Sequence, residues 1–309
     1  MNKFFLKLSR AIIPHLPRGK SFAINTTLSL FGHKFGGVIT LPDGQKFFID
    51  IISPVKRHLF FANKYEERDT QIFQRMVKSG DYFFDVGSSF GWYSILASGL
   101  VGMSGKVFAF DMVPDIIQEF KNNISLNKLD DNIVIENTAL GEKDGIVDYL
   151  YSPNTEMGNF QLEMLKDGHK ELNTKTLKTG KTKITSLDRY VEENAIHRVD
   201  FIKVDIDGAE VPFLRGARKT LSSKKPAIII EVSERGQKAQ GHSCQEIFYE
   251  LSQLGYKFFS VRFMLRAIGP HEFNRVTKED VLCLPVDKIG IVPELAQGLS
   301  RDELPRGEL

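Results

Sequence analysis

Short apolar runs alternate with amphipathic stretches along most of this chain. Each run has the length and the near-continuous hydrophobicity of a strand that is covered on both faces. The strands predicted in this way are 82–86, 106–110, 133–136, 199–204 and 227–232. Apolar residues spaced three or four positions apart predict helices at about 69–79, 115–127, 186–194, 209–221 and 243–255. Strands that alternate with helices predict an α/β fold with a doubly wound, mostly parallel sheet.

The pattern changes outside this alternating region. Towards the C-terminus, the apolar stretches 256–263 and 280–285 are separated by a turn-rich segment and are expected to pair antiparallel. Towards the N-terminus, residues 36–51 alternate on either side of Asp43-Gly44, which predicts a β-hairpin. In the middle, residues 152–183 are polar and weakly periodic, and a loop of this length is usually functional or mobile.

The chain therefore divides into three parts. Residues 1–68 form an extension that holds the hairpin and, before Pro14, a short helix with one apolar face and several basic residues. Residues 69–290 form the alternating domain, and residues 291–309 form a polar tail. The helix, within residues 1–13, either docks on its own domain or makes loose contact with an anionic membrane surface.

Composition narrows the class of protein only modestly. The chain is 42% hydrophobic and 26% charged, which is ordinary for a globular protein, and no run of about 18 apolar residues predicts a transmembrane helix. A net charge of +2 gives no sign of a nucleic-acid partner. Cys244 and Cys283 have no metal-ligand spacing and suggest no disulfide framework, so we expect a reducing, cytoplasmic location.

Two segments of the predicted sheet end in polar turns. They read YFFDVGSSFGWYS (82–94) and KVFAFDMVPD (106–115), and their strands break at Asp85 and Asp111. In a parallel α/β sheet such breaks lie at the carboxyl ends of the strands, where ligands bind. We therefore expect both carboxylates to face a nucleotide-like cofactor.

The glycines after Asp85 do not have the spacing of a dinucleotide-binding turn. A Gly-x-Gly-x-x-Gly turn that begins at Gly87 would need glycines where the chain has Ser89 and Trp92, and no P-loop lysine follows. The turn has instead Gly87 and Gly91, which let the backbone approach a ligand closely.

S-adenosylmethionine matches these residues. It carries no phosphate, and it needs close backbone contact around its methionine part, an acceptor for its ammonium group and a carboxylate for its ribose. The two glycines, Asp85 and Asp111 supply these in that order, because an ionised carboxylate can accept hydrogen bonds from both ribose hydroxyls. Another nucleotide-type cofactor, or an α/β crossover without a ligand, stays an alternative at this point.

A second acidic cluster follows the strand 199–204, within FIKVDIDGAEVPFLRGA. Its members Asp205, Asp207 and Glu210 repel one another unless a cation, such as a metal ion or a sulfonium cofactor, compensates. Lys203 is close in sequence, and we expect it on the side of Asp205 only if the strand bends. The alternative for Asp207 and Glu210 is that they stabilise the start of the next helix through its dipole.

These segments resemble the FkbM family of S-adenosylmethionine-dependent methyltransferases. The matching stretches are, in order, YEERDTQIFQRMVKSGDYFFDVGSSFGWYSILAS, KVFAFDMVPDIIQEFKNNISLN, NTALGEKDG, TSLDRYV, and DFIKVDIDGAEVPFLRGARKTL with KPAIIIEVSE. They cover most of residues 65–234, and their common order makes the match specific. The resemblance implies a Rossmann-like sheet of seven strands, mostly parallel with the last strand antiparallel. In the sequence, this sheet follows the N-terminal helix and hairpin.

The resemblance also implies a set of cofactor-binding residues. They are Tyr65, Glu66, Asp85, Gly87, Ser89, Gly91, Asp111, Asn137, Thr138 and Ala139. The 85–91 turn would line the methionine end of the cofactor, Asp111 would hold the ribose, 137–139 would lie beside the adenine, and 65–66 would close over the pocket. The chain departs from the family at Ser89, where Asn is usual, and at Asp111, where Glu is usual.

The implied reaction is O-methylation of a hydroxyl, often on a sugar or a natural product. A hydroxyl is a poor nucleophile until it loses its proton, so a base or a metal ion helps. Asp205 is our first candidate for the base or a ligand, and Glu231, which ends the next strand, is the second. Together they could hold Mg²⁺ through oxygen ligands. His242 is a third candidate base, with the alternative that it is an ordinary surface histidine.

These residues and motifs are compatible with three functions. The first is an O-methyltransferase for a sugar or polysaccharide precursor, and the second is a methyltransferase for a lipid or secondary metabolite. The third is a non-catalytic, cofactor-binding scaffold of the same fold, against which the presence of Asp85, Asp111 and Asp205 argues. An NAD-dependent oxidoreductase is disfavoured by the missing glycines.

Overall fold

The computed structural model describes most of the chain. The described ranges are 36–50, 54–129, 132–151, 158–159, 178–262 and 265–290, together with residues 8, 12, 13, 23, 24, 26 and 27. Most of residues 1–13 and the whole tail 291–309 lie outside them, so the membrane contact expected of the first segment stays a prediction. Within the described ranges, no helix is long and apolar enough to cross a membrane.

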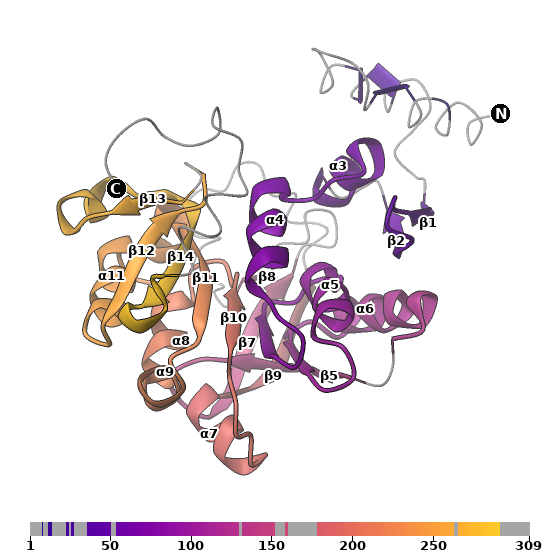
Figure 1. The fold of residues 1–309 in the computed structure, drawn as a ribbon. Helices are drawn as coiled ribbons and strands as arrows, with labels where there is room; N and C mark the ends of the chain where they lie inside the picture. The colour runs from indigo at the N-terminus through magenta and orange to yellow at the C-terminus, as the bar shows by residue number, and fades with distance from the viewer. Residues whose placement is uncertain are drawn as a thin grey trace.

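An eight-stranded sheet forms the centre of the described structure (Figure 1). Its strands, in spatial order, are β13 (Arg266–Ile268), β12 (Tyr256–Ser260), β14 (Lys278–Pro285), β11 (Ala227–Ser233), β10 (Phe201–Val204), β3 (Tyr82–Val86), β4 (Lys106–Phe110) and β5 (Ile133–Glu136). The five strands from β11 to β5 are parallel, and β14 runs antiparallel to both of its neighbours. The predicted antiparallel last strand is thus confirmed. The eighth strand, β13, extends the predicted seven at one edge, where it pairs with β12.

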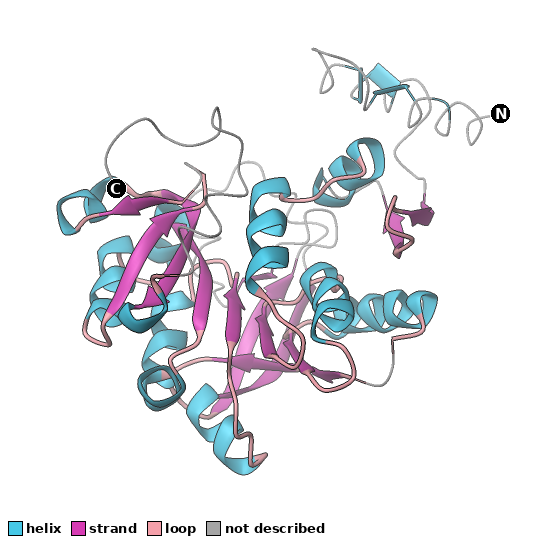
Figure 2. Ribbon diagram, in the orientation of Figure 1, coloured by secondary structure: helices cyan, strands magenta, loops and turns pink. Residues whose placement is uncertain are grey.

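Helices cover both faces of this sheet (Figure 2). One face carries α4 (Glu67–Met76), α5 (Trp92–Val101) and α6 (Pro114–Asn127), and the other carries α7 (Leu187–Glu193), α8 (Glu210–Gly216), α9 (Arg218–Lys224) and α11 (Cys244–Ser252). The helix predicted over 209–221 is therefore two helices. Gly216, a poor helix former packed against the backbone of Gly141, ends the first of them.

Several elements outside the large sheet were not predicted. The helices α3 (Pro54–Ala62) and α10 (Glu234–Ala239) are two of them. A second sheet contains β6 (Thr138–Leu140), β9 (Lys178–Thr185), β7 (Gly145–Tyr151) and β8 (Gly158–Asn159). Of these strands only β7 is predicted, because the sequence favours an extended segment at 146–151. Residues 178–183 of the predicted loop thus belong to a strand. β9 is ordered by its pairing with both β6 and β7, whereas its polar residues, half of them exposed, do not predict a strand from the sequence.

The predicted hairpin is present and is bonded to α6. Its strands are β1 (Gly36–Thr40) and β2 (Lys46–Asp50). The backbone N–H groups of Phe48 and Lys46 donate to the side-chain oxygens of Asn123 and Asn127, at 2.7 Å and 2.8 Å. On the buried face, the ring of Phe47 lies 5.1 Å from that of Trp92. The hairpin therefore packs directly behind the turn that follows β3.

Gly91 shows how tightly this turn is packed. Its φ is +92°, and a Cβ there would lie 2.1 Å from the ring of Phe120 on α6. Gly91→Ala should therefore destabilise the fold by about 1–3 kcal/mol, measured by urea unfolding. Gly99 on α5 is the matched control, because a Cβ there has open space and helical alanine is more stable than glycine. Gly99→Ala should stabilise slightly, and equal effects of the two substitutions would show that the turn tolerates a side chain at position 91.

Candidate active site

A cavity of about 250 Å³ opens at the carboxyl ends of β3, β4 and β10. Nine of the residues expected from the sequence line it, namely Tyr65, Glu66, Asp85, Gly87, Ser89, Asp111, Thr138, Ala139 and Asp205. Gly91, Asn137 and Glu231 are not among the lining residues. The carboxyl-end location expected for the ligand site therefore matches the position of the cavity.

The turn after β3 forms the floor of the cavity. Gly87 has a φ of +86°, and a Cβ there would lie 1.9 Å from the carbonyl oxygen of Asp205. Only glycine therefore lets the loops after β3 and β10 pass each other at this point. Ser89 also has a left-handed backbone, with φ at +49°. Gly91, in contrast, begins α5 and packs on Phe120 instead of facing the cavity.

Asp111 is held by backbone N–H groups at the end of β4. Its two oxygens accept hydrogen bonds from Ser89 N at 3.1 Å and from Val113 N at 2.9 Å. Burial raises the pKa of Asp111 to about 6, while these bonds to the carboxylate act in the opposite direction. Each oxygen has lone pairs beyond the one used here, so the carboxylate can accept further bonds from a ligand in the cavity.

Asp85 is almost fully buried below the same turn. It accepts a hydrogen bond from Ser94 Oγ at 2.6 Å. Burial raises its pKa to about 7, although Ser94 and the charge of Lys203 both lower it. A cationic group in the cavity would favour the ionised form, as expected for a residue that receives an ammonium group.

Ser88 is a lining residue that was not predicted from the sequence. Its side chain is 4% exposed, and its hydroxyl has no hydrogen-bond partner among the described residues. A buried hydroxyl without a partner carries a cost, which a polar ligand atom in the cavity would remove. Its position between Gly87 and Ser89 was visible in the sequence, but a serine in a turn has no distinctive signal.

Of the three residues expected beside the adenine, two line the cavity and the third supports a neighbouring strand end. Thr138 and Ala139, at the start of β6, line the cavity. Asn137 is exposed, and its amide donates to the backbone oxygen of Asp111 at 3.0 Å. Asn137 thus stabilises the end of β4 next to the cavity.

Tyr65 and Glu66 form the opposite wall. The Tyr65 ring packs edge-on against Phe90 and Trp92, with centroids 5.6 Å and 5.4 Å away. Glu66 accepts a hydrogen bond from Tyr93 Oη at 2.7 Å. Burial raises the pKa of Glu66 to about 7. The aromatic residues of this wall lie in the same motif as Asp85, where they were indistinguishable from ordinary core residues.

Lys203 also lines the cavity, although its side chain is only 1% exposed. Its Nζ is 2.9 Å from Asp280 and 3.4 Å from Asp205. Lys203 and Asp205 share one face without any bend, because alternate residues of a strand point to the same side. The expectation that this pairing requires a bent strand was therefore wrong. Burial lowers the pKa of Lys203, but the carboxylates of Asp280, Asp205 and Glu66 outweigh it and hold this pKa above its ordinary value.

The other three acidic residues near β10 differ from one another in their contacts and in whether they line the cavity. Glu210 is fully buried, accepts hydrogen bonds from the N–H groups of Ile206 and Gly208, and is bonded to Gln237. It therefore stabilises the turn before α8. Asp207 has a φ of +50° and lines the cavity. Glu231 is paired in register with Asp280 one strand away.

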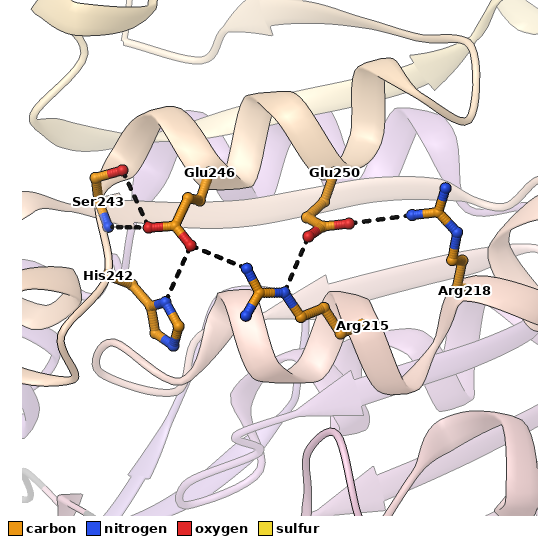
Figure 3. A network of polar contacts seen from close by, with 6 residues as sticks. All are labelled: Arg215, Arg218, His242, Ser243, Glu246 and Glu250. Carbon is orange, nitrogen blue, oxygen red and sulfur yellow. Dashed lines mark hydrogen bonds and ion pairs between the residues drawn. The ribbon is translucent and has the colours of Figure 1, made fainter.

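His242 belongs to a surface network of ion pairs (Figure 3). Its Nδ1 lies 3.1 Å from Glu246, which also caps α11 through Ser243 and meets Arg215 at 2.9 Å. Arg215 also bonds to Glu250, so the network ties α8 to α11. His242 is not a lining residue of the cavity.

The FkbM methyltransferase domain model matches residues 85–258, more than half of the chain. This chain belongs to the FkbM methyltransferase family. The matched range contains the turn after β3, Asp111 and the acidic segment after β10. All of the cavity-lining residues except Tyr65 and Glu66 therefore lie within the matched methyltransferase domain.

Individual relatives are more distant. A probable cobalt-precorrin-6B C(15)-methyltransferase (decarboxylating) from Sulfurisphaera tokodaii is 31% identical over 96 residues, which are 30% of this chain and 50% of that protein. The chain thus spans about half the length of this curated relative.

Solved structures similar to the chain include two methyltransferases. The methyltransferase FkbM of Methylobacillus flagellatus is 14% identical, with a TM-score of 0.43 over 74% of this chain and 52% of that one. The O-methyltransferase of Bacillus cereus in complex with SAH is 14% identical, with a TM-score of 0.43 over 72% and 83% of the two chains.

The sequence suggested that Asp205 and Glu231 could hold Mg²⁺. Within the described ranges, no group of three or more His, Cys, Asp or Glu side chains is arranged to hold a metal ion. Asp205 already pairs with Lys203, and Glu231 does not line the cavity. A metal ion at this pair stays a prediction from the sequence.

The raised pKa of Glu231 can be tested through the pH dependence of stability. Burial, and then repulsion from Asp205, Asp207, Glu210 and Asp280, raise its pKa from 4.5 to about 9. A raised carboxyl pKa stabilises the fold at low pH, and this stability is lost as the pH rises towards 9. Glu231→Gln should therefore raise the melting temperature more at pH 9 than at pH 5. Glu142→Gln, at an exposed site, is the control, and equal shifts at both pH values would show that Glu231 is not destabilised by ionisation.

Proposed function

We propose that this protein is an O-methyltransferase that transfers the methyl group of S-adenosylmethionine to a hydroxyl of a sugar or polysaccharide precursor. The observation that carries the proposal is the meeting of Gly87, Asp85 and Asp111 in one cavity at the carboxyl ends of adjacent parallel strands. Family membership supports the methyl transfer, and the choice of a hydroxyl acceptor rests on the chemistry of the cavity.

The residues present fit the cofactor. Asp111 would accept the ribose hydroxyls, Asp85 would receive the ammonium group, and the buried Ser88 hydroxyl would gain the partner that it lacks among the described residues. Thr138 and Ala139 would flank the adenine. When bound, S-adenosylmethionine supplies a methyl group that is already activated by the sulfonium charge, so the chain has mainly to position the acceptor.

The side of the cavity near Asp205 has the chemistry to bind a sugar. Asp205 is fixed by its pair with Lys203, and a carboxylate can accept hydrogen bonds from two hydroxyls. Tyr65 and Trp92 supply aromatic surface that can pack against the apolar C–H face of a sugar ring. We propose that Asp205 binds and orients the hydroxyl that receives the methyl group.

The aromatic wall also suits a second class of acceptor. A lipid or a secondary metabolite with a hydroxyl on an apolar frame would pack against Phe90 and Trp92 in the same way. A panel of acceptors should therefore contain both classes, with and without magnesium. A non-catalytic scaffold would bind the cofactor and methylate none of them.

The ribose assignment predicts the effect of Asp111→Asn. Loss of the charged acceptor should weaken S-adenosylmethionine binding about tenfold or more, because a hydrogen bond to a charged group contributes about 1.5–3 kcal/mol. Titration calorimetry with S-adenosylmethionine, S-adenosylhomocysteine and NAD measures this directly. Asp115→Asn, an exposed site on α6 paired with Lys178, is the control. Unchanged affinity in the Asp111 variant would rule out its contact with the ribose.

The acceptor assignment predicts the effect of Asp205→Asn. Methyl glycosides and glycan fragments, with a hydroxylated lipid beside them, are incubated with tritiated S-adenosylmethionine. We expect transfer to a sugar hydroxyl, with kcat/KM for the acceptor about tenfold lower in the variant and the cofactor affinity unchanged. Transfer to the lipid alone would favour the second acceptor class. Equal kcat/KM in both proteins would remove Asp205 from acceptor binding.

A further inference from the structure

Glu66 lies in an unusual turn of the cavity wall. It precedes α4 with a φ of +40°, a left-handed conformation that is costly for any residue with a Cβ. The turn is fixed from behind, because Thr70 Oγ1 donates to Tyr65 O at 2.9 Å and receives a hydrogen bond from Trp92 Nε1 at 3.0 Å. The strained backbone thus holds a carboxylate at a defined place in the wall of the cavity.

Four other carboxylates line the cavity: three are bonded to partners, and the fourth, Asp207, stays mostly protonated at neutral pH because burial and the charges of Asp205 and Glu210 raise its pKa to about 8. Asp85 is bonded to Ser94, Asp111 to two backbone N–H groups, and Asp205 to Lys203. Glu210 and Glu231 are not lining residues. Within the part of the chain that the structure describes, Glu66 is bonded to a neutral phenol, Tyr93, rather than paired with a cation at hydrogen-bond distance.

The groups that face Glu66 set its proton affinity. Burial raises the pKa, as do the charges of Asp205 on the β10 loop and Asp280 on β14, whereas Lys203 on β10 and the Tyr93 hydroxyl on α5 lower it. The Asp69 carboxyl on α4 and the Tyr65 hydroxyl also face this group. The pKas of Tyr65 and Tyr93 are raised well above their ordinary value, so both phenols stay protonated at neutral pH and act as donors. The balance gives Glu66 a pKa of about 7, which suits a base that works near neutral pH.

We propose that Glu66 is the carboxylate that takes the proton from the acceptor hydroxyl, while Asp205, paired with Lys203, orients that hydroxyl. This inference rests on the proposed function. As the hydroxyl oxygen forms its bond to the methyl carbon, the carbon–sulfur bond breaks and its electron pair stays on sulfur. The hydroxyl proton passes to Glu66, which later releases it to solvent. Two carboxylates in one cavity thus have different roles because their neighbours differ.

The first test uses the methyl glycosides and tritiated S-adenosylmethionine between pH 6 and pH 9. Glu66→Gln should lower kcat by about 100-fold or more, weaken S-adenosylmethionine binding much less than that, and leave the affinity for S-adenosylhomocysteine unchanged. Glu67→Gln, at an exposed position on the same helix, is the control. Tyr93→Phe should move the acidic limb of the pH–rate profile to higher pH, because the ionised carboxylate loses a donor. Asp205→Asn should lower the rate without moving that limb upward.

The second test needs no acceptor. Calorimetry near pH 7 in phosphate and in Tris measures the protons released when a ligand binds. The sulfonium charge of S-adenosylmethionine should drive a proton off Glu66, whereas the neutral thioether of S-adenosylhomocysteine should not. We expect wild-type protein to release more protons with the first ligand than with the second, and Glu66→Gln to reduce this difference.

The outcomes separate the two proposals. Wild-type protein that does not bind S-adenosylmethionine overturns the proposed function, and this inference with it. Binding with a proton difference that is the same in wild type and Glu66→Gln overturns the role of Glu66 alone. Turnover of Glu66→Gln equal to that of wild type does the same. A lower kcat with unchanged affinity for S-adenosylhomocysteine, or a reduced proton difference, supports it.

Discussion

The buried ammonium group of Lys203 is the interaction on which the acidic side of this site depends. A charge with 1% exposure is costly unless it is paired, and here Asp280 and Asp205 provide the pairs. Equally, the two partly exposed carboxylates would repel each other without the ammonium group between them. Because Lys203 is on central strand β10, it can pair with Asp280 on β14 across the intervening β11 and, through Asp205, affects the cavity itself.

Several residues in the wall of the cavity around this charge have left-handed backbone conformations, which most residues avoid. Gly87, Ser89, Glu66 and Asp207 all have positive φ, and they come from three separate loops. Such conformations persist only when the surroundings fix them. The loops after β3 and β10 fix each other by direct contact, and the hairpin supports the aromatic residues behind Glu66 through Phe47.

Local patterns predicted the centre of the fold more accurately than its periphery. Strands 82–86, 106–110 and 133–136 have the predicted bounds, because a strand buried on both faces is a continuous apolar run. β9 was missed, because it is polar and exposed along much of its length and its order comes from pairing with distant segments. The same reason explains β13, a three-residue edge strand that extends the predicted seven.

The sequence by itself determined the family, the parallel sheet and the two strand ends that carry Asp85 and Asp111, because these depend on spacing within single segments. The tertiary structure decided which side chains share the cavity. It brought the Ser88 hydroxyl into the wall, left Asn137 outside it, and placed Lys203 between carboxylates from different strands. Strand register and loop crossing set those contacts, and both depend on residues far apart in the chain.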